Sequence, residues 1–203
     1  MIGIIDYGMG NLMSVKKAFE ELGFRVKLMK CPEDLTNVNG LVLPGVGAFG
    51  DAIKNLTESA WVDVIKEAVA IGMPFLGICL GMQLLFSESF EGGYFKGLDL
   101  IKGSVKKFDE KYIKLKVPHI GWNGVKKVKN SQLLSGIPDN TDFYFVHSYY
   151  CDPEEDVATG ITDYGAPFVS CVEKENIYGV QFHPEKSSRF GLQILKNFGE
   201  MSR

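Results

Sequence analysis

Residues 74–86, PFLGICLGMQLLF, indicate the fold class of this chain. Phe75 to Ile78 is wholly apolar, as expected for a strand covered on both faces by other elements. Residues 82–86 are typical of a helix, and between the two lies Gly77-Ile78-Cys79-Leu80-Gly81. A buried strand that leads directly into a helix, when repeated along a chain, is typical of a parallel α/β sheet.

The same alternation extends through the first half of the chain. Residues 2–6, 25–29 and 40–43 are typical of strands. A helix is predicted after Asn11, a plausible N-cap, and further helical material up to Ala70, with Ser59 able to cap the stretch around Trp61. These elements predict a doubly wound parallel sheet.

The second half changes to strand-like segments separated by turns. The pattern predicts strands at 105–108, 122–128, 143–149, 168–173 and 177–182, which we expect to add antiparallel strands to the same sheet. A last helix at about 189–201 should bury Phe190, Ile194, Leu195 and Phe198. The predicted fold is one α/β domain over residues 1–203, with a doubly wound mixed central sheet, helices on both faces and antiparallel strands added by the C-terminal half.

Charge and hydropathy exclude several classes of protein. The 203 residues carry a net charge of −3, whereas a nucleic-acid binder usually shows a basic excess. No run reaches the roughly 18 apolar residues of a membrane-spanning helix. Asp6 closes the first apolar run, which no basic region precedes, so this run is typical of a first strand rather than a signal peptide. We therefore expect a cytoplasmic protein that binds neither nucleic acid nor membrane.

The four cysteines, at positions 31, 79, 151 and 171, should then be reduced thiols. They form no Cys-x-x-Cys pair, so a zinc site has little support. Gly8-Met9-Gly10 lacks the third glycine of a dinucleotide-binding motif. We expect no metal and no cofactor, and we interpret every cysteine except Cys79 as a packing residue.

Cys79 stands at the centre of a nucleophile elbow, G-x-C-x-G. A sharp strand-to-helix turn strains the central residue and brings its neighbours together, so glycine is needed at both flanking positions. The following helix N-terminus favours a thiolate, and the N–H of Leu80 can donate to an oxyanion. The alternative is a structural cysteine in a glycine-flanked turn.

His183 and Glu185 are the predicted base and its orienting carboxylate. In an extended segment residues i and i+2 point to one side, about 6.6 Å apart along the chain. Pro184 between them disfavours the helical conformation for His183. Alone, this triplet would favour a surface histidine beside a solvated glutamate, and the combination with the cysteine elbow favours the catalytic interpretation. An acid that follows its histidine by two residues also differs from the chain order of an α/β-hydrolase.

In order along the chain, further motifs are IDYGMGN (5–11), LPGVGAF (43–49), GICLGMQLLF (77–86), PHIGWN (118–123), YFVHSY (144–149) and GVQFHPEKS (179–187). With these motifs the sequence resembles the triad (class I) glutamine amidotransferases. Within that class it resembles the glutaminase subunits of imidazole glycerol phosphate synthases of histidine biosynthesis. The resemblance covers nearly the whole chain and implies that glutamine is hydrolysed through a cysteine thioester.

The resemblance also implies roles for particular residues. It makes Cys79 the nucleophile, His183 the base and acid, and Glu185 its orienter. It implies a second oxyanion N–H from Val46, beside that of Leu80, in a loop thought to flip when the partner's site is occupied. The implied glutamine-binding residues are Gly47, Gln83, Glu91, Ser148 and Tyr149. The implied interface residues are Asn11, Trp122, Tyr144 and Lys186.

The implied partner is a (βα)₈-barrel synthase subunit, joined as a heterodimer, that receives the ammonia. Two other interpretations stay open: the glutaminase of another amidotransferase, or a non-catalytic domain with a redox cysteine. Without the resemblance, these residues have ordinary structural interpretations. His119 and His147 are interpreted as structural histidines. Trp122 and Tyr144 could be half-buried aromatics, and Lys186 could be a solvated lysine.

Overall fold

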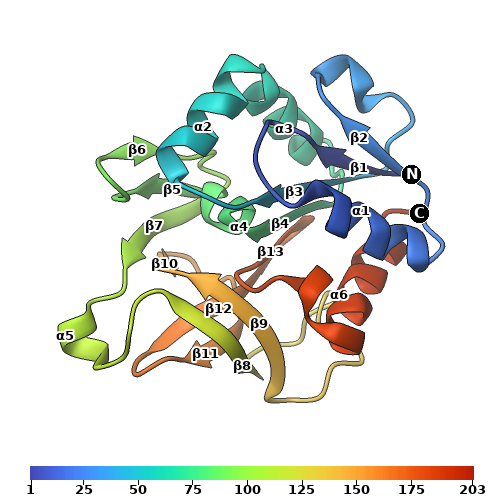
Figure 1. Ribbon diagram of the computed structural model, residues 1–203. Coiled ribbons are helices and arrows are strands. Elements are labelled where there is room, and N and C mark those ends of the chain that lie inside the picture. The colour runs from blue at the N-terminus through green and yellow to red at the C-terminus, as the bar shows by residue number, and fades with distance from the viewer.

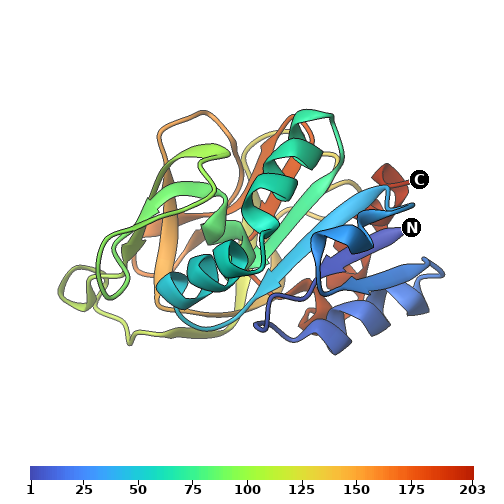
Figure 2. The same cartoon turned by 90° about the horizontal axis from the view of Figure 1, so that it is seen from above.

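The computed structural model describes residues 1–203, and one long mixed sheet runs through it (Figures 1 and 2). Five parallel strands form its first part, in the order β2-β1-β3-β4-β13. Their bounds are β1 (Ile2–Ile5), β2 (Val26–Met29), β3 (Gly40–Gly45), β4 (Phe75–Cys79) and β13 (Ile177–Val180). The carboxyl ends of parallel neighbours meet at one edge, and this is where such sheets bind ligands.

The second half of the chain extends the sheet beyond β13. The order continues β12-β10-β7-β5-β6, and a branch from β12 carries β11, β8 and β9. Most of these pairs are antiparallel, as predicted, although β5 runs parallel to β7. The bounds are β5 (Phe86–Ser89), β6 (Phe95–Lys96), β7 (Ile101–Lys107), β8 (His119–Lys127), β9 (Thr141–His147), β10 (Tyr149–Pro153), β11 (Ala158–Asp163) and β12 (Pro167–Lys174).

Helices cover both faces of the parallel strands (Figure 1). α1 (Leu12–Glu21) and α6 (Ser188–Met201) lie on one face, and α2 (Phe49–Glu58) and α3 (Trp61–Ala70) lie on the other. Two shorter helices are α4 (Leu80–Leu84), directly after β4, and α5 (Glu110–Ile113), which lies beyond β7 and away from the parallel strands. Two hydrophobic cores result, because successive strand residues point to opposite faces. Ile4 packs into the core beneath α1 and α6, and its neighbour Ile5 into the core beneath α2 and α3. The predicted α/β fold class is confirmed.

Several local predictions were wrong. Ser59 does not cap α3: its hydroxyl donates to the Asn55 carbonyl at the end of α2, and Ala60 precedes α3 in a left-handed conformation. Phe86 begins β5 instead of ending a helix. Asn11 does occupy the predicted N-cap position of α1, although its side chain makes no capping hydrogen bond. Cys31 is exposed, so it is no packing residue.

The predictions for the buried face of α6 and for two of the packing cysteines agree with the structure. Ile194, Leu195 and Phe198 of α6 are fully buried, and Phe190 packs against the same core. Cys151 and Cys171 are buried free thiols. None of the helices is both long and apolar enough to cross a membrane.

Candidate active site

Cys79 is the last residue of β4, and α4 begins directly after it. Its backbone has φ 55° and ψ −109°, a conformation that L-residues rarely adopt. A Cβ on Gly77 would lie 2.5 Å from the Gly81 carbonyl oxygen, so this position requires glycine. A Cβ on Gly81 would instead collide with the Leu43 carbonyl oxygen of β3. Both glycines of the elbow are thus needed, each against a different backbone segment.

His183 reaches the elbow because β13 lies beside β4. The two strands are parallel, with Val180 opposite Ile78, so the residues that follow both strands share one edge of the sheet. His183 is extended (φ −100°, ψ 96°), as expected before proline, and Glu185 lies in a short 3₁₀ turn. His183 Nδ1 and Glu185 Oε1 are 2.9 Å apart, with side chains only 3% and 1% exposed. This spacing fits a carboxylate that orients an imidazole ring.

The protonation of His183 depends on two opposing effects. Burial by itself lowers the pKa of His183, but interaction with Cys79 and Glu185 outweighs burial and raises the pKa to about 9. With Nδ1 facing the carboxylate, Nε2 is the nitrogen left to exchange a proton, and it is buried without a hydrogen-bond partner. Such a ring, beside a thiol, is equipped for acid–base catalysis.

A cavity of about 360 Å³ opens beside the cysteine. Cys79 lines it, and so do both candidate oxyanion donors, Val46 and Leu80. All five residues expected to bind substrate also line this cavity: Gly47, Gln83, Glu91, Ser148 and Tyr149. Three further lining residues carry no predicted role: Pro118, Val146 and His147.

Two polar side chains of the cavity are held in place by the fold. Gln83 Nε2 donates to the Tyr149 carbonyl at 3.0 Å and to Gln181 Oε1 at 3.1 Å. Glu91 Oε2 accepts from the Phe49 N–H, the first residue of α2, at 2.8 Å. Burial raises the pKa of Glu91, while this hydrogen bond opposes the rise.

Gln181 is a site residue that the sequence motifs did not identify. It is fully buried, and its Nε2 lies 3.7 Å from Cys79 Sγ. Its position two residues before His183, just after a buried strand, was the available signal. The cysteine sulfur also lies 4.0 Å from the Val146 carbonyl oxygen, so the Gln181 amide and this carbonyl both contact the thiol.

Three of the four expected interface residues form one surface cluster. Trp122 and Tyr144 lie opposite each other on β8 and β9, with ring centroids 6.2 Å apart. Lys186 Nζ is 5.9 Å from the Tyr144 ring centroid, and Trp122 is 54% exposed. Asn11 is exposed on a different element, at the start of α1.

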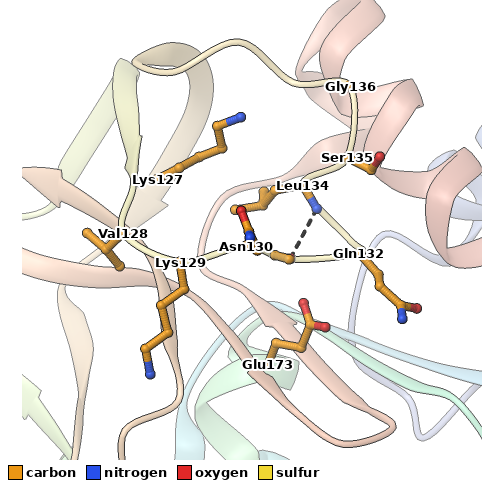
Figure 3. A pocket seen from close by; sticks show the side chains of 10 residues that line it. Lys127, Val128, Lys129, Asn130, Gln132, Leu134, Ser135, Gly136 and Glu173 are labelled. Carbon is orange, nitrogen blue, oxygen red and sulfur yellow. Dashed lines mark hydrogen bonds between the residues drawn. The ribbon is translucent and has the colours of Figure 1, made fainter.

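A larger hollow of about 910 Å³ lies elsewhere, between the segment 127–136 and β12 (Figure 3). Its lining is mostly polar and includes Lys127, Lys129, Asn130 and Glu173, but no cysteine and no histidine. Lys129 is paired with Asp156 and Lys127 donates to the Ile137 carbonyl, so both cations already have partners. In the whole structure, no three His, Cys, Asp or Glu side chains are grouped as ligands for a metal ion. The cavity beside Cys79 is therefore the candidate active site, although the hollow at residues 127–136 is larger.

A cysteine elbow, a buried His–Glu pair and this doubly wound sheet together define a class-I glutamine amidotransferase. The family model described as glutamine amidotransferase class-I matches residues 3–201. The imidazole glycerol phosphate synthase subunit HisH of Moorella thermoacetica is 55% identical over 203 residues, covering 100% of this chain and 95% of that protein. The HisH subunit of Methanocaldococcus jannaschii is 49% identical, covering 99% and 100%. The chain belongs to this HisH family of class-I glutamine amidotransferases.

Solved structures agree on the fold. A crystal structure of a glutamine amidotransferase superposes with a TM-score of 0.77 at 17% identity, covering 99% of this chain and 98% of that one. At such identity the similarity concerns the arrangement of helices and strands. It supports the doubly wound sheet and adds nothing on substrate.

Proposed function

We propose that this protein hydrolyses L-glutamine to glutamate and ammonia, with Cys79, His183 and Glu185 as its catalytic triad. The observation that carries the proposal is a strained cysteine that lines a substrate-sized cavity and also interacts with the histidine of a buried His–Glu pair. A cysteine kept only for packing has no need of a backbone conformation that costs about 1–3 kcal/mol.

The reaction begins when the Cys79 thiolate attacks the side-chain amide carbon of glutamine. The resulting oxyanion accepts from the Leu80 N–H and, in the competent conformation, from the Val46 N–H. His183 donates its Nε2 proton to the departing ammonia, which leaves an acyl thioester on Cys79. His183 then takes a proton from water, the hydroxide attacks the thioester, and glutamate and the free thiolate are released.

Recognition of the amino-acid end of glutamine falls to Gln83 and Glu91. Glu91 has one carboxylate oxygen bound to the start of α2, which leaves the other for the α-ammonium group. Gln83 uses its Nε2 within the protein and keeps Oε1 as a free acceptor. The loop at Gly47 and the bend at Ser148, between β9 and β10, form the remaining walls of the cavity.

The Val46 loop accounts for control of the reaction. Val46 is 41% exposed, and a Cβ on the adjacent Gly47 would lie 2.8 Å from the Met9 side chain, so two surface loops touch here. Removal of one oxyanion donor typically costs about 3 kcal/mol of barrier. A Val46 N–H that points away from the substrate would therefore keep the free enzyme nearly silent until the partner turns the loop.

The partner is a (βα)₈-barrel synthase subunit, bound as a heterodimer, which uses the ammonia to make imidazole glycerol phosphate in histidine biosynthesis. The names of the relatives, subunits of that synthase, support a synthase partner. The cluster of Trp122, Tyr144 and Lys186 is suited to such an interface, because aromatic side chains are enriched at interface centres. Asn11 would contact the partner from the start of α1.

The test measures synthesis by the assembled heterodimer with either glutamine or ammonium as nitrogen source. Cys79→Ala should abolish glutamine-driven synthesis and leave ammonium-driven synthesis intact. Cys171→Ala, which truncates another buried thiol, serves as the matched control and should support both. Loss of the ammonium-driven reaction in Cys79→Ala would mean that the cysteine is structural.

Labelling with iodoacetamide separates an amidotransferase from a domain with a redox cysteine. A Cys31→Ser background removes the one exposed thiol and leaves Cys79 as the cysteine that lines the cavity. Glutamine should slow alkylation of Cys79 more than norleucine does, because norleucine keeps the amino-acid end but lacks the side-chain amide. Equal alkylation with and without glutamine would favour the redox interpretation.

A further inference from the structure

Two buried histidines outside the triad form a direct ring-to-ring hydrogen bond. His119 on β8 lies opposite His147 on β9 in the strand register. Nδ1 of His119 is 3.0 Å from Nε2 of His147. The residues are 2% and 6% exposed, and His147 also lines the cavity beside Cys79.

The direction of this hydrogen bond is determined from both ends. Asn123 Oδ1 accepts from the Gly124 N–H at 2.8 Å, which identifies the other side-chain atom as the amide nitrogen. This nitrogen, Nδ2, donates to the Asp163 carbonyl and lies 3.3 Å from His119 Nε2. His119 Nε2 is therefore an acceptor and Nδ1 carries the proton, which it donates to His147 Nε2.

The contacts of His147 indicate the same direction for the hydrogen bond between the two rings. His147 Nδ1 lies 2.8 Å from the Tyr149 carbonyl oxygen, which can only accept. His147 Nδ1 must then carry the proton and Nε2 must accept from His119. Every donor meets an acceptor when both rings are neutral Nδ1–H tautomers. Burial lowers the pKa of His119 to about 4 and that of His147 to about 3, so both rings stay neutral at working pH.

The chain of hydrogen bonds continues into the active site. The Tyr149 carbonyl that accepts from His147 also accepts from Gln83 Nε2 at 3.0 Å. Gln83 donates its second proton to Gln181 Oε1, which turns the Gln181 amide nitrogen toward Cys79 Sγ at 3.7 Å. An unbroken series therefore links the surface strand beside Trp122 to the nucleophile.

We propose that His119 and His147 are positioning residues for glutamine hydrolysis, which hold the Tyr149 carbonyl so that Gln83 and Gln181 are aligned with the substrate and with the Cys79 thiol. This inference rests on the proposed glutaminase activity. Tyr149 and Gln83 form one wall of the substrate cavity. Loss of the His147 donor frees that carbonyl and lets the wall and the Gln83 amide shift together.

Packing is the competing explanation for the pair. His119 stacks on Tyr164 with centroids 3.9 Å apart and on Phe145 at 4.9 Å. Leucine and asparagine have the same shape but differ in polarity, so they separate the two explanations. His147→Asn keeps an N–H donor near the Nδ1 position, whereas His147→Leu keeps bulk and apolar contact only. A packing role favours leucine, and a positioning role favours asparagine.

The experiment measures the glutamine concentration that half-protects Cys79 from iodoacetamide, in the full chain with Cys31→Ser. Loss of roughly one hydrogen bond should raise this concentration about tenfold in His147→Leu, and His147→Asn should stay within about threefold of the parent. With the synthase partner, glutamate release should show the same order in KM. Urea unfolding of each variant reports stability separately.

Equal protection in His147→Leu and the parent would overturn the positioning role, and so would better protection in the leucine variant than in the asparagine variant. If His147→Leu does not fold, the matched pair His119→Leu and His119→Asn decides in the same way. An NMR finding of Nε2–H on either ring also overturns the inference. If glutamine fails to protect Cys79 in the parent chain, the proposed function itself is wrong.

Discussion

Replacement of Cys79 by glycine should relieve backbone strain that alanine at the same position retains. The residue has φ 55° and ψ −109°, and a side chain in so sparsely populated a region costs about 1–3 kcal/mol. Glycine adopts positive φ freely, but it loses roughly 0.5–1 kcal/mol through greater freedom of the unfolded chain. The buried methyl group of alanine contributes about 0.8 kcal/mol more.

With strain relief near the middle of its range, these opposing effects almost cancel. Cys79→Gly should therefore be about as stable as Cys79→Ala, or about 0.5 kcal/mol more stable. The control is Ala52→Gly in the buried interior of α2, where no strain is relieved. There the helix preference costs about 1 kcal/mol and the lost methyl about 0.8 kcal/mol, giving a loss of about 2 kcal/mol.

Urea unfolding followed by circular dichroism measures both differences, with equal slopes required for a valid comparison. Comparing glycine with alanine excludes the thiol from the result, because both variants lack it. A loss of about 2 kcal/mol at position 79, equal to the Ala52 control, would refute the reasoning that the elbow stores strain.

Three further predictions concern single side chains. Cys79→Ala should lower the pKa of His183 from about 9, since the thiol is first among the groups that raise it; NMR titration checks this, and an unchanged pKa contradicts it. That pKa lies above the unfolded value of about 6.5, so the contribution of His183 to stability is complete below pH 6.5 and is lost as the pH rises through 9. The urea midpoint should therefore fall between pH 6.5 and 9, and it should fall more in the wild type than in Cys79→Ala. Glu91→Gln should raise KM for glutamine about tenfold with little change in kcat, as expected for loss of a charged contact to the α-ammonium group, and a fall confined to kcat would contradict that role. Tyr7→Phe should leave stability unchanged or raise it by about 1 kcal/mol, because the buried Tyr7 hydroxyl has no partner, and a loss of 2 kcal/mol or more in urea unfolding would reveal a hidden one.

The elements that could be predicted from the sequence are those with a strong local signal. The apolar run before Cys79 and the glycines around it define a buried strand and a sharp turn, and both depend only on neighbours along the chain. The start of β5 was missed because Phe86 continues an apolar helical pattern up to the residue where pairing with β7 takes over. β6 was missed because its two residues are too few to show a pattern. Ser59 was assigned to the wrong helix because its hydroxyl can serve the end of one helix as readily as the start of the next.

The residues of the candidate active site also differ in how far a local sequence signal identifies them. His183 and Glu185 were recognisable because an i, i+2 spacing across proline is itself a geometry. The contacts of Gln181, His147 and His119 depend on the pairing of β4 with β13 and of β8 with β9, strands that lie far apart in the chain. A shift of one residue in either register would turn these side chains to the other face of the sheet. Since register is set by the whole packed sheet, Cys79, His183 and Glu185 could be proposed from short motifs, whereas the contacts of Gln181, His147 and His119 could be found only in the folded structure.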